Sequence, residues 1–271
     1  MTDNRDLSFV PTKNPNPKLL SQDEIARFNE QGYVKPFRIY DDAGVAANRE
    51  FFNSLMTQLE TADDGRDSYS INGYHKSCGG IYDMVINPLI LDHVEDLLGP
   101  DFLAWGTHFF CKTSHDDRKV PWHQDASYWP LDPSRTITAW LAIDDADEEN
   151  AAMQFIPGTH RMGHLHWETT RDPAVLNQEI QNVDAYGEPV FDTLKAGEMS
   201  LHADMLAHGS AANSSDRRRC GLTIRYSPPT VKPLDPGWAE GAIRCRGKDG
   251  TGTWKYIERP ENEALPKTSR G

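Results

Sequence analysis

The stretch Trp122-His123-Gln124-Asp125-Ala126-Ser127-Tyr128-Trp129 places a histidine and an aspartate two residues apart, between aromatic side chains. On a β-strand, side chains two residues apart leave the same face, so His123 and Asp125 would lie side by side. An imidazole and a carboxylate, joined by a second imidazole from elsewhere, form the facial set that holds Fe(II) and leaves positions open for oxygen chemistry. The stretch therefore indicates half of a metal site.

The His-x-Asp pattern is weak evidence on its own, because it occurs three times in a chain with 10 histidines. His115 and Asp117 lie in a charged run that is typical of a solvated loop. His202 and Asp204 stand just ahead of His208 and form a rival pair. A lone buried histidine such as His202 is, however, expected to be a hydrogen-bonded structural residue. The aromatic neighbours favour the pair in 122–129, since they provide a low-water environment.

Composition excludes several classes of partner. Lys and Arg number 28 and Asp and Glu number 41, which gives a net charge of −13 without a long basic run. Such a surface is unsuited to nucleic acid and to anionic membranes. No run of about 18 apolar residues could span a bilayer, and the first residues lack the apolar core of a signal peptide. The 4 cysteines form no CxxC pair, so we expect free thiols in a soluble cytoplasmic protein, as a monomer or homodimer.

In the first third of the chain, the sequence predicts helices that are preceded by an N-terminal arm. Residues 1–18 are polar and proline-marked, which predicts a tail or a draped arm. Helices are expected over 21–31, 46–59 and 88–98, and a strand over 33–40. The intervening segment 63–80 is polar and glycine-bearing, and it predicts a loop in which His75, Lys76 and Cys78 are solvated.

The remainder of the chain has the texture of short strands separated by turns. The candidate strands cover 102–111, 122–129, 136–143, 153–156, 198–202 and 221–227. Helices followed by at least six short strands predict an α+β chain, mainly β, whose body is a double-sheet jelly roll with flanking N-terminal helices. We expect residues 19–271 to form one domain. The polar segment 163–190 predicts an insertion that folds over a site as a lid.

A second stretch offers what the half-site lacks. His208-Gly209-Ser210 supplies another imidazole, and Arg217-Arg218-Arg219 follows it, before a β-rich run. Arginine is the side chain that clamps a carboxylate with two parallel hydrogen bonds. An arginine one strand beyond a ligand histidine is therefore placed to hold the far end of a carboxylate-bearing cosubstrate.

Several motifs agree in order and spacing with a known family. They are Trp122-His123-Gln124-Asp125, Tyr128-Trp129-Pro130, Trp140, Ile156-Pro157-Gly158-Thr159-His160, His208-Gly209-Ser210 and Arg219. Together they resemble the phytanoyl-CoA dioxygenase family, which includes ectoine hydroxylase and related non-haem iron halogenases, and the similarity covers most of residues 20–230. The resemblance implies a double-stranded β-helix (a cupin-like jelly roll) that uses O2 to couple decarboxylation of 2-oxoglutarate to oxidation of a second substrate.

The resemblance assigns roles residue by residue. His123, Asp125 and His208 look like the Fe(II) ligands. Arg219, 11 residues after His208, resembles the arginine that binds the distal carboxylate of 2-oxoglutarate, and Ser210 resembles its hydroxyl helper.

Further positions follow from strand parity and from closeness to the motifs. Trp140 falls where the family places an aromatic beside the cosubstrate, with core packing as the alternative. His108 and Lys112 share a strand face on which the family often puts polar cosubstrate contacts. Arg225 has the strand parity of Arg219 and is the alternative clamp. The candidate substrate contacts are Tyr128, Trp129 and His160.

The expected activity is hydroxylation of an unactivated C–H bond in a small to medium polar metabolite, with release of succinate and CO2. Related halogenases carry a small residue in place of the carboxylate, so Asp125 favours hydroxylation over chlorination. Desaturation, cyclisation and epimerisation remain alternatives. So do a non-catalytic metal-binding jelly roll with a structural or sensing role, and a zinc hydrolase, which would not need Arg219 and Ser210.

Overall fold

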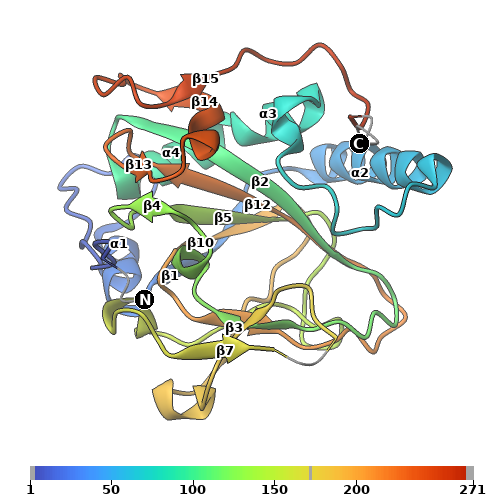
Figure 1. Ribbon diagram of the computed structural model, residues 1–271, viewed down its shortest axis with the longest axis horizontal. Coiled ribbons are helices and arrows are strands. Elements are labelled where there is room, and N and C mark those ends of the chain that lie inside the picture. Colours follow the sequence, from blue (N-terminus) through green and yellow to red (C-terminus); the bar gives the residue numbers. More distant parts are fainter. Residues whose placement is uncertain (1–3, 171–172, 267–271) are drawn as a thin grey trace.

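A computed structural model describes residues 4–170 and 173–266, and it shows a β-core with helices packed on one side (Figure 1). The α-helices are α1 (Gln22–Gln31), α2 (Asp42–Ala62), α3 (Gly79–Val85) and α4 (Pro88–Leu98). The short 3-10 helices are η1 (Tyr74–Lys76), η2 (Asp125–Ser127), η3 (Thr159–Arg161), η4 (Val183–Tyr186) and η5 (Pro236–Ala239). The capping box of Ser21 and Glu24 that predicts the start of α1 is present.

The strands form the two sheets of a jelly roll, as expected, and every pair within them is antiparallel except β14 with β15. The larger sheet consists of β1 (Tyr33–Arg38), β10 (Glu198–Ala203), β5 (Ile137–Ala142), β12 (Arg219–Ser227), β2 (Phe102–Lys112), β14 (Glu240–Arg246) and β15 (Lys255–Tyr256), in that order. The smaller sheet consists of β3 (Val120–His123), β11 (His208–Ser210), β6 (Gln154–Phe155) and β9 (Val190–Phe191). Two separate pairs join β4 (Leu131–Asp132) to β13 (Lys232–Pro233) and β7 (Trp167–Thr169) to β8 (Gln178–Ile180).

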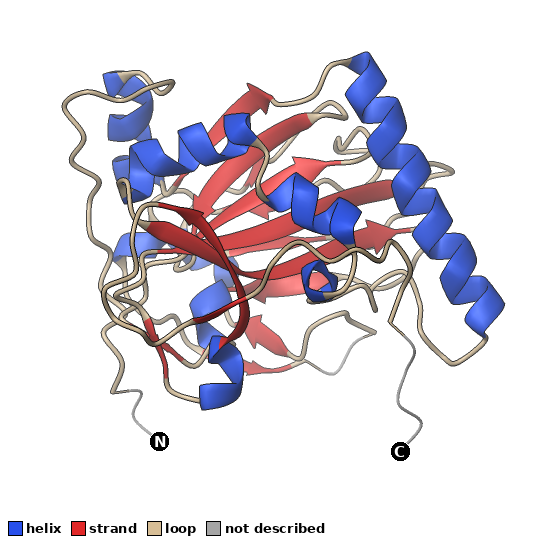
Figure 2. Ribbon diagram, turned by 90° about the horizontal axis from the view of Figure 1, so that it is seen from above, coloured by secondary structure: helices blue, strands red, loops and turns tan. Residues whose placement is uncertain are grey.

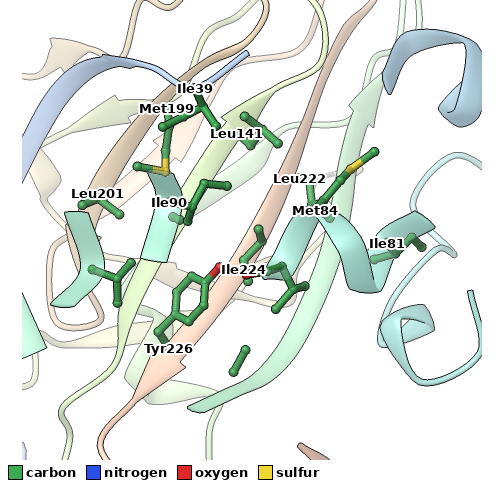
Figure 3. Close-up of a cluster of buried hydrophobic side chains, with 14 of the residues drawn as sticks. Ile39, Ile81, Met84, Ile90, Leu141, Met199, Leu201, Leu222, Ile224 and Tyr226 are labelled. Carbon is green, nitrogen blue, oxygen red and sulfur yellow. Dashed lines mark hydrogen bonds between the residues drawn. The ribbon is translucent and has the colours of Figure 1, made fainter. Parts of the chain in front are cut away.

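One face of the large sheet is apolar and is covered by helices (Figure 2). Leu222, Ile224 and Tyr226 alternate along β12 and belong to the same buried cluster as Met84 and Ile90 of the helices (Figure 3). Burial of an aliphatic side chain of this size contributes about 1.5–3 kcal/mol. This packing fixes which face of every strand points to the helices, and so it also fixes what the opposite face presents.

The opposite face of the same strands is polar and aromatic. Successive side chains of a strand point to opposite faces, so the residues between the apolar ones share the other side. Those that line one cavity there are Phe110, Trp140, His202, Arg219, Thr223 and Arg225. They are far apart in sequence, but β10, β5, β12 and β2 are consecutive neighbours in the sheet. The cavity also reaches residues of β3 and β11, and thus lies between the two sheets.

The N-terminal arm runs along the body of the molecule. The Arg5 guanidinium donates a hydrogen bond to the backbone oxygen of Ala126 at 2.9 Å. Farther along, the backbone N–H groups of residues 18–20 donate to the buried carboxylate of Asp96. The beginning of the arm therefore braces the short helix η2.

The segment 63–80 is not the solvated loop that its composition indicates. His75 and Cys78 are buried, whereas Lys76 is exposed as expected. One ring nitrogen of His75 lies 2.9 Å from Thr107 Oγ1 on strand β2. The prediction was wrong for His75 and Cys78, because their hydrogen-bond partners come from distant parts of the chain, which local composition does not reveal.

The insertion 163–190 lies beside the stretch with which the sequence analysis began. Its strands β7 and β8 form an antiparallel pair, and β8 contacts β3. The backbone N–H of Gln178 donates to Tyr128 Oη at 2.9 Å. The insertion is thus held against residues 122–129, while its opening and closing as a lid stays a prediction.

The four cysteines are free thiols, as their spacing predicts; three of them are buried and Cys245 is partly exposed. Within residues 4–170 and 173–266, no helix has both the length and the apolar character needed to cross a bilayer.

Buried histidines make the stability of this fold depend on pH. Burial lowers the pKa of His75, His108 and His160 to about 4 in each case. An exposed histidine in the unfolded chain titrates near 6.5. Between these values the unfolded chain binds more protons than the folded chain, so the free energy of unfolding falls as the pH falls from about 6.5 to 4.

We predict that His160→Gln reduces the slope of the free energy of unfolding against pH by about 1.4 kcal/mol per pH unit near pH 5, the contribution of one proton. Urea denaturation of the wild type and the variant between pH 7 and pH 5 measures both slopes. Parallel curves over this range would contradict the assignment of His160 as a buried neutral group.

Candidate metal centre and cosubstrate cleft

The two candidate ligand histidines are paired across neighbouring strands. Strands β3 and β11 run antiparallel, and His208 lies directly opposite His123 in their register. The centres of the two imidazole rings are 4.1 Å apart. Two residues that are 85 positions apart in sequence are thus held together by the backbone hydrogen bonds of the small sheet.

Hydrogen bonds fix the orientation of both rings. Nδ1 of His123 lies 2.7 Å from the backbone oxygen of Pro121, and Nδ1 of His208 lies 2.9 Å from that of Leu206. Because a carbonyl oxygen only accepts, each Nδ1 must carry the hydrogen and donate it. In the neutral rings, each Nε2 therefore presents a lone pair to the space between the sheets, which is the arrangement that metal-binding histidines use.

Asp125 completes the cluster from a different backbone position than expected. Strand β3 ends at His123, and Asp125 opens the 3-10 helix η2, so the expectation that both residues share one strand face was wrong. The turn still brings Asp125 Oδ1 to 3.6 Å from Nε2 of His123 and 3.9 Å from Nε2 of His208. The three ligand atoms lie within 4.8 Å of one another, a spacing at which one metal ion can bind all three.

A neighbouring threonine orients this carboxylate. Thr138 on β5 donates a hydrogen bond through Oγ1 to Asp125 Oδ2 at 3.1 Å, which leaves Oδ1 to face the imidazoles. The sequence analysis missed Thr138, although its strand parity with Trp140 was available as a signal. Gln124 was missed as well: its side chain is buried and bonds to the backbone of Gly163, Leu165 and Met205, which joins the ligand turn to the insertion.

The electrostatics of the cluster suit a cation. Burial alone would raise the pKa of Asp125, but the neighbouring imidazoles outweigh burial and hold that pKa well below its ordinary value. Burial, together with the nearby His123, holds the pKa of His208 well below its ordinary value. The carboxylate is thus ionised and His208 is neutral, which are the protonation states that metal binding requires.

The rival pair His202 and Asp204 does not form a second cluster. Asp204 is buried away from the imidazoles and accepts hydrogen bonds from Ser134 Oγ and the backbone of Thr136. Burial raises the pKa of Asp204 to about 6. His202 lines the cavity, but neither of its ring nitrogens has a hydrogen-bond partner, so the expectation of a hydrogen-bonded structural histidine was wrong. Its Nε2 lies 3.8 Å from Asp125, beyond hydrogen-bonding distance.

Arg219 lies in the same cavity and has no counter-ion. It is only 2% exposed, and it donates to the backbone oxygen of Ala151 and to Ser210 Oγ at 3.0 Å. In the described part of the chain, no acidic side chain forms an ion pair with it. A buried guanidinium without a carboxylate is costly, so the residues present fit a ligand that brings its own carboxylate, as 2-oxoglutarate does.

Trp140 and Gly221 shape the wall beside this arginine. The guanidinium carbon of Arg219 lies 5.6 Å from the Trp140 ring centre. The ring passes so close to β12 that a Cβ atom at Gly221 would lie 2.1 Å from it. A glycine is therefore required opposite the tryptophan, and the ring is held where the resemblance places an aromatic beside the cosubstrate.

Two further expected cosubstrate residues lie at the margins. Lys112 is the register partner of Arg219, but its Nζ donates to the backbone oxygen of Arg118 at 2.6 Å. Burial and the nearby Arg219 lower the pKa of Lys112 to about 7. His108 bonds to the backbone oxygen of Tyr69 at 2.7 Å and faces a second, more open cavity.

The second cavity opens on the metal cluster and has a volume of about 550 Å³. Asp125 and Arg225 line both cavities, so the two adjoin at the Asp125 carboxylate. Tyr128 and Trp129, which the sequence analysis expected at the substrate, line this cavity. His160 lies outside both: it packs edge-on against Phe9 and bonds to the backbone of helix α1. We therefore leave His160 out of the proposed site.

A comparison with family models decides the class of the protein. The model described as "Phytanoyl-CoA dioxygenase (PhyH)" matches residues 28–221, which is more than half of the chain. The chain belongs to the phytanoyl-CoA dioxygenase family. Members of this family are Fe(II)- and 2-oxoglutarate-dependent oxygenases, so the cofactors expected from the sequence, Fe(II), 2-oxoglutarate and O2, are confirmed at the level of the family.

Individual relatives agree with this class. The peroxisomal phytanoyl-CoA dioxygenase of Mus musculus is 27% identical over 242 residues, which cover 84% of this chain and 67% of that protein. Matches to the bovine, rat and human enzymes of the same name span only about half of their length, 45–46%. Among solved structures, the non-heme monooxygenase ThoJ is similar, with 29% identity, a TM-score of 0.76 and coverage of 88% of both chains.

The fold is also shared by an enzyme of another reaction type. The carbocyclase SnoK from nogalamycin biosynthesis has a TM-score of 0.64 at 22% identity, over 80% of this chain and 89% of SnoK. At this identity the likeness shows the fold alone. Membership of the phytanoyl-CoA dioxygenase family therefore fixes the chemistry of the cofactors but not the fate of the substrate.

We predict that Thr138→Val weakens metal binding by roughly tenfold to a hundredfold, the usual effect of removing a hydrogen bond from a ligating group. Titration of the protein with Co(II), followed by visible absorption under conditions without turnover, measures the dissociation constant. Thr223→Val is the matched control, because Thr223 lies on the same sheet face and donates to the backbone of His108 instead. Equal affinities for both variants would contradict the role of Thr138.

Proposed function

We propose that this chain hydroxylates an unactivated C–H bond of a small to medium polar metabolite and consumes 2-oxoglutarate and O2. One oxygen atom enters the product and the other enters succinate, with loss of CO2. The observation that carries the proposal is the presence of the Asp125 carboxylate beside the Nε2 atoms of His123 and His208. A carboxylate at this place occupies the position that chloride takes in the halogenases, which favours oxygen transfer.

The residues divide the work by position. His123, Asp125 and His208 hold the iron, which supplies the oxidising chemistry when bound. The guanidinium of Arg219 and the hydroxyl of Ser210 point into the same cleft and hold the distal carboxylate of 2-oxoglutarate. Trp140 covers one side of that cleft, and Lys112 lies beside Arg219 behind it. His108, Tyr128 and Trp129 belong to the substrate side, since they line the open cavity.

Two other classes of function are less well supported. A metal-binding jelly roll with a structural or sensing role would have no need for a buried arginine without a counter-ion. A zinc hydrolase would be indifferent to 2-oxoglutarate. Desaturation, cyclisation and epimerisation use the same metal and cosubstrate, and differ only in how the substrate is placed. Mass analysis of the product separates them, because only hydroxylation adds one oxygen atom.

The cosubstrate assignment gives the next prediction. Arg219→Gln should raise the dissociation constant of 2-oxoglutarate by about tenfold or more, since a hydrogen bond to a charged group contributes about 1.5–3 kcal/mol. The weak visible charge-transfer band of the anaerobic Fe(II) and 2-oxoglutarate complex measures that constant directly.

The matched control is Arg217→Gln, because Arg217 pairs with Asp147 and Glu149 on the surface of the protein. An absent band in the wild type, or an undiminished band in His123→Ala, would exclude the proposed site. Equal 2-oxoglutarate affinity in Arg219→Gln and the wild type would exclude only the clamp.

A further inference from the structure

Arg225 is a second arginine of the site, partly buried, that the cosubstrate does not require. It lies on the site face of β12 and contributes to the lining of both cavities. Its Nε is buried and has no hydrogen-bond partner. Within residues 4–170 and 173–266, no carboxylate forms an ion pair with it.

The surroundings of Arg225 hold it in place without neutralising it. Its guanidinium carbon lies 5.6 Å from the ring centre of Trp105 and 5.1 Å from that of Trp129. Gly106 is its register partner on β2, and a Cβ atom there would lie 3.3 Å from the Arg225 side chain. A cation is attracted to the electron-rich faces of aromatic rings, which orients the guanidinium but leaves its five N–H donors to be satisfied.

The positive charge of Arg225 is not balanced when the formal charges of the loaded site are summed. The formal charges of Fe(II), the Asp125 carboxylate, the 2-oxoglutarate dianion and the Arg219 guanidinium sum to zero. Asp125 is the one acidic side chain among the described residues that line the open cavity, whereas Arg225 and Lys76 are cationic. A loaded site therefore keeps an excess positive charge on the substrate side, and a partly buried guanidinium is stabilised by an anionic partner.

We propose that Arg225 binds an oxyanion of the primary substrate, a carboxylate or a phosphoryl group, while the tryptophan-lined wall takes the apolar part of the same molecule. The inference rests on the proposed function and names the substrate class of that site. Because Arg225 and Asp125 line the same cavity, the anchored group lies near the iron ligands. The oxidised carbon is then within a few bonds of the anionic group.

The first test compares an anion with its neutral counterpart in the wild type. Protein loaded with Co(II) and an oxygen-stable 2-oxoglutarate analogue, which fills the Arg219 cleft, is titrated with 3-phenylpropionate and with 3-phenylpropanamide. Tryptophan fluorescence reports binding, since Trp105, Trp129 and Trp238 line the cavity. The carboxylate is expected to bind at least about tenfold more tightly, as a charge-assisted hydrogen bond implies. Equal affinity, or no binding of the anion, overturns the proposal.

The second test assigns the preference to Arg225. In Arg225→Gln the difference between the anion and the amide should disappear, while Arg225→Lys should retain part of it. Arg244→Gln is the matched control, because Arg244 also stacks on an aromatic ring, Tyr256 at 4.5 Å, but lies on the surface. A preference that survives in Arg225→Gln overturns the proposal. Replacing the propionate by 2-phenylethylphosphonate then shows whether the planar or the tetrahedral oxyanion is favoured.

A third measurement separates this inference from the proposed function. Arg225→Gln should leave the 2-oxoglutarate affinity of the anaerobic Fe(II) complex unchanged, in contrast to Arg219→Gln. A loss of that affinity would make Arg225 a cosubstrate residue and overturn the substrate role. If the charge-transfer band is present but the anion is not preferred, only the anion site is refuted. If the band is absent, the oxygenase assignment is refuted, while the titration with the two probes still tests the anion site.

Discussion

The site depends on the two-sided pleat of the central strands β10, β5, β12 and β2. Each strand sends alternate residues into the helix-covered core, and the residues between them face the small sheet. A register slip of one residue would exchange the two faces, so that Leu222 and not Thr223 would face the cavity. The apolar core prevents this slip, because a slipped strand would bury polar side chains and expose aliphatic ones. The geometry of the site is therefore inherited from the packing of its far side.

A metal site also requires that its candidate ligand atoms are oriented before a metal binds, and contacts around the small sheet provide this orientation. The backbone carbonyls of Pro121 and Leu206 set the tautomers of the two histidines, and Thr138 sets the free oxygen of Asp125. These contacts come from three separate segments of the chain. Each uses a backbone carbonyl or a hydroxyl group to orient one side chain of the cluster. A site oriented in this way loses little conformational entropy on binding.

The cationic side chains in and around the cavity make an unfavourable electrostatic contribution to the stability of the protein. Arg219 is buried and Arg225 is partly buried, both without carboxylate partners among the described residues, and Lys112 is buried beside Arg219. Such groups lower the stability of the protein without ligands. Ligands that carry negative charge raise the stability again, because they bind only the folded state. These cations depart from the usual rule that buried charges are paired, and such departures are expected where function overrides stability.

The sequence by itself determined the starts of helices α1 and α4 and the β-rich body, and it predicted the ligand set. Capping residues and period-two alternation are local signals, and the spacing of His123, Asp125 and His208 within several ordered motifs identified the family. Only the tertiary structure decided that Asp125 lies on a 3-10 turn, that His75 is buried and that His202 lacks hydrogen-bond partners. It also decided that Thr138 donates a hydrogen bond to Asp125 and that Arg225 lines the open cavity. The physical reason is that hydrogen-bond satisfaction and charge pairing depend on partners from distant strands, and sequence neighbours carry no record of them.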